Sequence, residues 1–137
     1  MVTGTRLSLL NSAAGRVFAT WLPRSQVQPL IVKELCGNNL PPGVHSLDDA
    51  WGLLAEVERR GVSAISGNYA VKGVEAVSAP VFNFKNELTM ALIIVGVEGS
   101  IDMGPDSPVI AELKRASRSL SLRLGSTRDS EQPAAAD

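Results

Sequence analysis

The apolar side chains near the start of the chain follow two different periods. Residues 5–10 (TRLSLL) predict a short strand, and Asn11-Ser12 then offers a helix cap. Beyond this cap, apolar side chains recur every three or four positions, at Ala14, Val17, Phe18 and Trp21. This spacing predicts a helix over residues 13–21. A second helix is expected from Leu22-Pro23 to about residue 35, although Pro29 is tolerated only in the first turn of a helix.

Residues 36–45 (CGNNLPPGVH) combine two glycines, two prolines and two asparagines, which predicts a loop. Ser46 then resembles a helix N-cap, and acidic residues follow in the first turn. The apolar stripe of this third helix consists of Leu47, Trp51, Leu54 and Val57. Arg59-Arg60-Gly61 is a stop signal, because basic side chains suit the negative end of the helix dipole and glycine suits the residue after it.

Strands are predicted in the middle of the chain. Residues 62–65 form a short strand, residues 66–68 turn the chain, and residues 69–71 are expected to pair back. Two longer strands follow over residues 75–84 and 87–96, with Lys85-Asn86 as the hairpin turn between them.

The end of the chain predicts one more helix. Residues 99–108 form a loop, and residues 108–124 are helical, with Gly125 as the stop. The polar, alanine-rich residues 126–137 are expected to be disordered. The predicted order is β-α-α-α-β-β-β-β-α. Because short turns join adjacent strands, we expect an α+β domain with an antiparallel sheet flanked by helices.

Composition fits one globular domain. The chain has 137 residues, of which 45% are hydrophobic and 20% charged, and its formal net charge is −1. A stand-alone nucleic-acid binder usually carries a basic surplus, which this chain lacks. Cys36 is the single cysteine, so no intrachain disulfide can form. The start shows no signal-peptide pattern, and the longest apolar run is far shorter than a membrane helix, so we expect a cytoplasmic location and no membrane contact.

Candidate chemistry is sparse. His45 is the single histidine, and together with Cys36 it supplies only two metal ligands, so no metal site is expected. His45 is expected to be a solvated loop residue, and the chain has no Gly-x-Ser-x-Gly elbow. Asp48 and Asp49 are neighbours on a helix and point apart, which suits dipole partners better than paired catalytic acids.

Anion and nucleic-acid motifs are also weak. The glycines match neither the Walker pattern nor the dinucleotide fingerprint. Arg115, Arg118 and Arg123, with Lys114 beside them, place a basic face on the last helix, which is more often a solvated face than a nucleic-acid contact. The residues therefore favour a non-catalytic domain without a cofactor.

Four segments, taken in order, carry a family resemblance. They are RLSLLNSAAGRVFATWLP (6–23), VERRGVSAISGNYAVKGVEAVSAPVFN (57–83), NELTMALIIVG (86–96) and VIAELKRASRSLSLRLG (109–125). Together they resemble the C-terminal effector-binding domain of IclR-type bacterial transcriptional regulators. Each motif alone is weak, but their shared order and spacing over about residues 5–125 are specific.

The resemblance implies a GAF-like α+β fold that is not catalytic. In that family a small organic molecule, often a carboxylate, binds on one side of the sheet and alters how a dimer or tetramer presents its helix-turn-helix domains to an operator. We therefore expect residues 1–125 to form a partial effector-binding domain and residues 126–137 a disordered tail. DNA would be bound only through a helix-turn-helix domain that this chain does not contain, and the chain is expected to form homo-oligomers.

The same resemblance implies a ligand site. Ala13 and Ala14 match the small-residue turn whose backbone amides receive the ligand's carboxylate at a helix N-terminus, a place that favours anions. The remaining positions that match the site are Ser66, Val74, Ala76, Ile93 and Val95.

Two of these positions indicate the kind of ligand. Relatives often carry hydroxyl side chains where this chain has Ile93 and Val95. A polar ligand group left unpaired against them would cost about 1–3 kcal/mol. We therefore expect an effector with an anionic end and an apolar or aromatic body. The alternative for Ile93 and Val95 is plain core with no ligand.

Three functions remain open from the sequence. The first is the small-molecule sensing domain of a transcriptional regulator. The second is a free-standing GAF-like ligand-binding or structural module without regulatory output, and the gene sequence upstream of Met1 would distinguish it from the first. The third, an enzyme on a similar fold, would need Cys36 or His45 at a pocket mouth beside a carboxylate.

Overall fold

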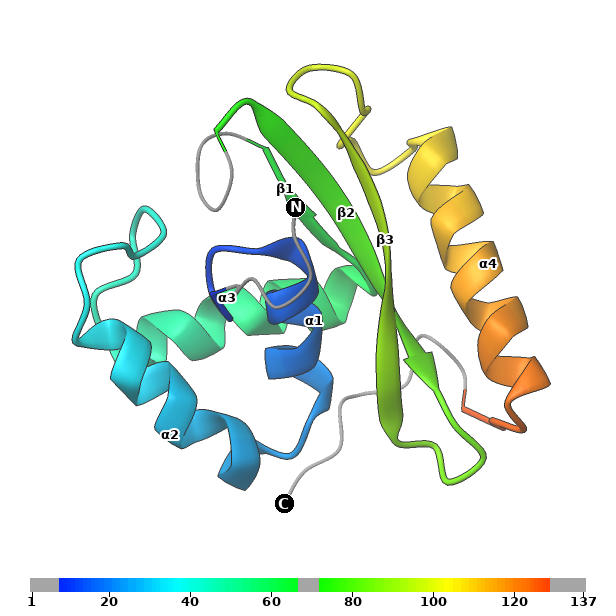
Figure 1. Cartoon of the computed structure of the whole chain (residues 1–137), viewed down its shortest axis with the longest axis horizontal. Helices are drawn as coiled ribbons and strands as arrows, with labels where there is room; N and C mark the ends of the chain where they lie inside the picture. The colour runs from blue at the N-terminus through cyan, green and yellow to red at the C-terminus, as the bar shows by residue number, and fades with distance from the viewer. Residues whose placement is uncertain (1–7, 67–71, 129–137) are drawn as a thin grey trace.

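A computed structural model of the chain describes residues 8–66 and 72–128 and shows an α+β domain, as expected (Figure 1). The expected strand at residues 69–71 lies outside the described residues. The described elements, in chain order, are α1 (Ala13–Trp21), α2 (Arg24–Leu35), α3 (Leu47–Arg60), β1 (Ser63–Ile65), β2 (Val74–Phe82), β3 (Leu88–Val97) and α4 (Pro108–Arg123). In Figure 1, α4 covers one face of the sheet, and α1, α2 and α3 lie on the other side.

Local signals define the helix ends. Ser12, Ser46 and Ser107 are the N-caps of α1, α3 and α4, and each side chain accepts a hydrogen bond from a backbone N–H in the first turn. Gly61 ends α3 in the left-handed conformation, with φ of 79°, where glycine is favoured over residues with a Cβ. The predicted bounds of α1 and α3 are therefore confirmed.

Two local predictions are wrong. The described part of the expected strand at residues 5–10, which begins at Ser8, is irregular rather than extended in a sheet. Pro29 lies inside α2 rather than in its first turn. Because proline lacks an N–H, one helical hydrogen bond is lost there. Burial of Val27 and Ile31 on the inner side of α2 offsets this loss and keeps the helix continuous.

The three described strands form an antiparallel sheet in the order β1-β2-β3. The hairpin between β2 and β3 turns at residues 83–87, where the Asn83 N–H donates to the Glu87 carbonyl over 3.0 Å. Asn86 adopts φ of 60°, which asparagine tolerates better than most residues. The predicted hairpin at Lys85-Asn86 is confirmed.

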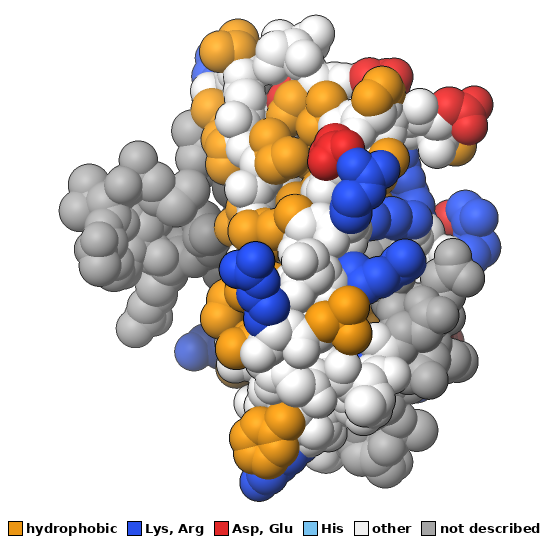
Figure 2. Space-filling view, turned by 90° about the vertical axis from the view of Figure 1, so that its right-hand side faces the viewer, with side chains coloured by type: hydrophobic (Ala, Val, Ile, Leu, Met, Phe, Trp, Pro, Cys, Tyr) orange, Lys and Arg blue, Asp and Glu red, His pale blue; other side chains and the backbone are white. Residues whose placement is uncertain are grey.

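The face of the sheet toward α4 is closely packed. Val77 and Ala79 of β2 are fully buried there against Ile110 and Leu113 of α4. On the outer side of the molecule, Figure 2 shows lysine and arginine side chains gathered among apolar ones. In the described structure Arg115 of this helix forms an ion pair with Glu112, so part of the basic charge is compensated locally.

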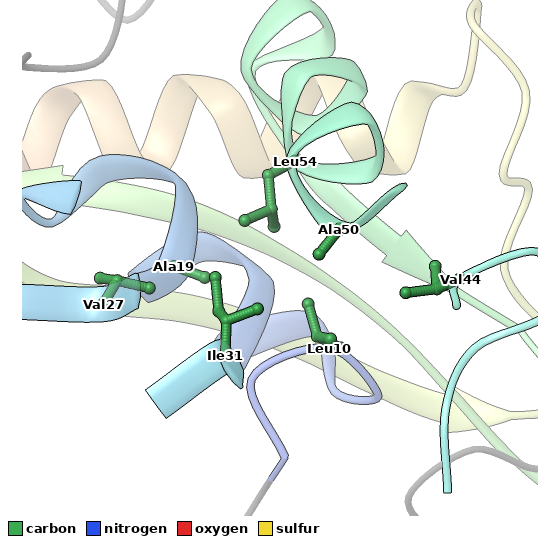
Figure 3. Close-up of a cluster of buried hydrophobic side chains, with 7 residues drawn as sticks. All are labelled: Leu10, Ala19, Val27, Ile31, Val44, Ala50 and Leu54. Carbon is green, nitrogen blue, oxygen red and sulfur yellow. The ribbon is translucent and has the colours of Figure 1, made fainter. Parts of the chain in front are cut away.

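The helices on the other side have a core of their own. Seven buried side chains from α1, α2, α3, the segment before α1 and the loop before α3 form it, and Figure 3 shows them: Leu10, Ala19, Val27, Ile31, Val44, Ala50 and Leu54. This cluster fixes α1 against α2 and α3, so α1 can present its opposite side to the sheet.

The first residues of the expected disordered tail are ordered. The side-chain oxygen of Asn86 accepts hydrogen bonds from the Ser126 hydroxyl and from the N–H groups of Thr127 and Arg128, at 2.9–3.1 Å. The Arg128 guanidinium lies 4.6 Å from the centre of the Phe82 ring. A turn 40 residues earlier in the chain therefore holds residues 126–128, a contact that composition does not reveal.

Candidate functional site

The turn before α1 is held firmly by side chains from elsewhere. Glu34 of α2 accepts hydrogen bonds from the backbone N–H groups of Leu9 and Leu10, at 2.7 and 3.2 Å. The Arg16 Nε donates to the Leu10 carbonyl over 2.7 Å. These bonds account for the irregular backbone at residues 8–10, because the two N–H groups donate to a carboxylate rather than to the carbonyls of a neighbouring strand.

The N-terminus of α1 presents two backbone amides without partners. Ser12 accepts from the Gly15 N–H through its side chain, and its carbonyl accepts from the Arg16 N–H. The N–H groups of Ala13 and Ala14 make no hydrogen bond within the described residues, although both residues are buried. A Cβ on Gly15 would collide with the Ser8 carbonyl and the Ser12 hydroxyl, so glycine is required for this tight entry into the helix.

Along its sheet-facing side, α1 changes from large to small residues. Toward its C-terminus, Val17 and Trp21 pack against Phe82 and Leu88 of the sheet, and the Trp21 and Phe82 rings meet edge to face with centres 6.5 Å apart. We call this the packed half of the α1 face. One turn before Val17 and Phe18, the same side of the helix carries only Ala13 and Ala14.

The opposite end of the α1 face contains the predicted sheet positions. Ala76 pairs with Val95, so both side chains point to the same face, and alternation along β2 makes it the face that carries Phe82. Ala76 and Val74 are half-buried, Ile93 is 41% exposed and Val95 is 60% exposed. We call this end, with Ala13 and Ala14, the small-residue half. The structure thus places six of the seven predicted site residues on one side of the sheet.

Ser66 differs from the other six. Alternation beyond β1 turns its side chain toward the α4 side, and its hydroxyl donates to Glu75 Oε1 over 3.1 Å. Glu75 is buried, and it also accepts from the Gly99 N–H at 2.7 Å and the Ile101 N–H at 2.6 Å. The Gly99 bond is the main cause of a lowered pKa of the Glu75 carboxyl, and the Ile101 and Ser66 bonds add to it against the opposing effect of burial.

Sequence reasoning missed two serines in the small-residue half. Ser63 of β1 pairs with Ser78 of β2, and Ser78 pairs in turn with Ile93 of β3. Both serines are fully buried, and neither hydroxyl has a hydrogen-bond partner in the described structure. Alternation from Ala76 could have placed Ser78 on this face, but Ser63 depends on the pairing of β1, which the sequence does not specify.

The small-residue half suits non-covalent binding. Its sheet residues carry no ionisable side chain, and its polar groups are backbone amides and hydroxyls. His45 is exposed in the loop before α3, and Cys36 is exposed at the end of α2. Across residues 8–66 and 72–128, no three histidine, cysteine or acidic side chains are grouped so that they could hold a metal ion. None of the described helices is long and apolar enough to cross a membrane.

A three-stranded antiparallel sheet with α4 on one face and α1 on the other defines an α+β class of domain. The chain belongs to the IclR C-terminal family of bacterial transcriptional regulators, whose family model matches residues 1–122. The predicted family and fold are thereby confirmed.

Known proteins agree with this assignment. An uncharacterized HTH-type transcriptional regulator of Escherichia coli (strain K12), RhmR, is 31% identical over 123 residues, which are 89% of this chain and 46% of that protein. The crystal structure of Pseudomonas aeruginosa HmgR is similar with a TM-score of 0.79 and 32% identity over 94% of this chain and 50% of that one. The chain thus spans about half the length of these relatives.

A third similarity concerns a structure with a bound small molecule. It is the inducer-binding domain of an Acinetobacter PobR double mutant, solved with 3-hydroxybenzoic acid. The TM-score is 0.69 and the identity 22%, over 86% of this chain and 67% of that one. At this identity the likeness establishes a shared fold.

Proposed function

We propose that this chain is the effector-sensing domain of a transcriptional regulator and binds a small organic acid with an apolar or aromatic body. The acid's carboxylate accepts hydrogen bonds from the Ala13 and Ala14 amides, and its body lies against Val74, Ala76, Ile93 and Val95. The observation that carries the proposal is the pair of unpartnered backbone N–H groups of the buried residues Ala13 and Ala14, at the end of α1 that carries small side chains.

Two physical effects support this arrangement. Unsatisfied N–H groups and the helix dipole both favour a negative charge at the start of α1. An apolar body covering Ile93 and Val95 would remove apolar surface from water, which is favourable by about 25 cal/mol per Å². A PobR inducer-binding domain of similar fold forms a complex with 3-hydroxybenzoic acid, which supports an aromatic acid as the ligand of this proposal. Ser66, whose hydroxyl is bound to Glu75, would lie at the rim of the site.

The proposal includes the assembly of the whole regulator. The domain itself is non-catalytic and works as a dimer or tetramer. DNA contact belongs to a helix-turn-helix domain, as in the relative named as an HTH-type regulator. A free-standing ligand-binding module would bind the same acids, but the acid would then change no operator binding when the chain is joined to such a domain.

The first test is thermal-shift screening of small carboxylic acids. Benzoate and phenylacetate are compared with benzamide and phenylacetamide, which have similar bodies but no charge. An acid at 100 times its Kd should add about 2.7 kcal/mol to the free energy of unfolding, whereas the amides should add little. Equal stabilisation by acids and amides, or no stabilisation by any acid, would contradict the anion site.

A backbone substitution tests the amide directly. Ala13 is the first residue of α1, where proline is tolerated, and Ser12 before it has the extended conformation that proline requires. Ala13→Pro therefore removes one N–H and keeps the helix. Loss of a hydrogen bond to a charged group should weaken acid binding by about 10-fold or more in isothermal titration calorimetry. Ala13→Gly, which keeps the N–H, is the matched control and should bind acids nearly as the wild type does.

A further inference from the structure

Two serine hydroxyls in the small-residue half make no hydrogen bond within the described residues. Ser63 and Ser78 are both 0% exposed, and neither Oγ has a hydrogen-bond partner in the described structure. They face each other across β1 and β2, and they continue into Ile93 on β3, so that the three residues form one row across the sheet. Buried hydroxyls in native proteins normally have a partner, which can be a protein group, a water molecule or a ligand.

The row lies on the α1 face. Val77 and Ala79, the neighbours of Ser78 along β2, pack on the α4 face, so Ser78 points the other way. Phe82, four positions further along β2, contacts Trp21 of α1. The serine row is therefore the part of the small-residue half that lies nearest to the packed half, on the same side of the sheet as α1.

We propose that Ser63 and Ser78 bind a hydroxyl or carbonyl group on the body of the ligand, so that the preferred effector is an acid with a second polar group away from its carboxylate. This inference rests on the proposed function, because it uses the same site. A serine hydroxyl can both donate and accept, so either a hydroxyl or a carbonyl can be its partner. The ligand group reaches Ser78 from the side of β3, where the partly exposed Ile93 can change rotamer to admit it.

This inference refines the ligand expected from the sequence. Ile93 and Val95 alone favour a body without polar groups. The structure places two hydroxyls in the same row as Ile93, on the two neighbouring strands. The site therefore offers an apolar edge on β3 and a polar centre on β1 and β2, which suits a hydroxylated aromatic acid better than an unsubstituted one.

A partnered serine on the other face is the matched control. The Ser121 hydroxyl of α4 accepts from the Phe82 N–H at 3.0 Å and donates to the Ser117 carbonyl at 2.9 Å. Ser121→Ala removes a buried serine of the same chemistry whose hydrogen bonds are already complete. It should lower the denaturation midpoint and leave ligand selectivity unchanged, whereas Ser78→Ala should change selectivity without lowering the midpoint.

Isothermal titration calorimetry of matched acids tests the inference. The probes are benzoate with 3- and 4-hydroxybenzoate, and phenylacetate with 3- and 4-hydroxyphenylacetate. In the wild type, at least one hydroxylated acid should bind about 3- to 10-fold more tightly than its parent, as expected for one net hydrogen bond. Ser78→Ala and Ser63→Ala should reduce that preference, and the double variant should remove it, while affinity for the parent acid stays within about twofold.

The outcomes separate this inference from the proposed function. If every hydroxylated acid binds no better than its parent in the wild type, the serine inference is wrong and the acid site stands. The serine inference is also wrong if Ser78→Ala lowers the denaturation midpoint and leaves the preference unchanged, because a water molecule would then be the partner. If none of the six acids binds, the proposed function is wrong and the serine inference is rejected with it.

Discussion

The two halves of the α1 face are built from the same helix and the same sheet, yet they differ in chemistry. In the packed half, Trp21 meets Phe82 edge to face and both side chains are almost fully buried. In the small-residue half, one helical turn earlier, Ala13 and Ala14 face a sheet whose Val95 is 60% exposed. Packing of large rings stabilises the first half, where the Trp21 Nε1 is the buried polar atom without a partner among the described residues. The second half has no such rings and keeps the Ser63 and Ser78 hydroxyls without partners.

This difference indicates how a small domain separates stability from binding. A core of large side chains near the C-terminus of α1 holds the helix on the sheet, so the N-terminus needs only small side chains there. There the backbone amides and the serine hydroxyls remain available, at some expense in stability, because unpaired buried polar groups are unfavourable. A substitution in one half should therefore affect a different property from a substitution in the other.

The largest expected effect is in the packed half. Phe82→Ala removes a ring that is 2% exposed and in contact with Trp21, and it should lower the free energy of unfolding by about 3–5 kcal/mol. Phe84→Ala, two positions further along, removes a ring that is 69% exposed and should change stability by less than about 0.5 kcal/mol. Urea denaturation followed by tryptophan fluorescence measures both. Similar losses for the two variants would show that the packed half does not hold α1 on the sheet.

A smaller effect on stability, with a large one on binding, is expected from filling the other half. Ala14→Leu places a larger apolar side chain in the first turn of α1, within the small-residue half. It should weaken binding of the acid probes at least about 10-fold and change stability by less than about 1 kcal/mol. Ala19→Leu is the control, because Ala19 lies in the core between α1, α2 and α3, where overpacking costs about 1–3 kcal/mol. If Ala14→Leu destabilises the protein as much as Ala19→Leu, this half is closed core rather than a binding surface.

Sequence reasoning succeeded where the determining interaction is local. Ser46 and Gly61 mark the two ends of α3 by capping, and Asn86 marks the hairpin through its backbone conformation. Two strand-like segments on either side of Lys85-Asn86 were enough to predict that β2 and β3 pair as a hairpin. These features depend on residues within a few positions of each other.

It failed where partners are distant in the chain. The Glu34 carboxylate, 25 and 24 residues away in the chain, accepts hydrogen bonds from the backbone N–H groups of Leu9 and Leu10. The apolar content of residues 5–10 therefore wrongly predicted a strand. Asn86 holds residues 126–128 in the same way. The pairing of Ser63 with Ser78 requires the register of β1 on β2, which no local pattern specifies. The position of Ser63 beside Ser78 could for this reason not be predicted from the sequence.

The smallest expected effect concerns Glu75, which lies beside the small-residue half on the opposite face of β2. Because amide hydrogen bonds lower its pKa in the folded state, its ionised form stabilises the protein above the ordinary glutamate pKa of about 4.3, and this contribution is lost as the pH falls through the lowered folded value. Glu75→Gln should therefore be less stable than the wild type at neutral pH. The difference between their free energies of unfolding should narrow below about pH 4.3. Urea denaturation midpoints of both proteins from neutral to acidic pH measure this difference. Curves that stay parallel over the whole range would show that the Glu75 charge does not hold the turn at residues 99–101.

Benzoate affinity at neutral pH should change less than in Ala14→Leu, because Glu75 touches the rim at Ser66 and not the α1 face.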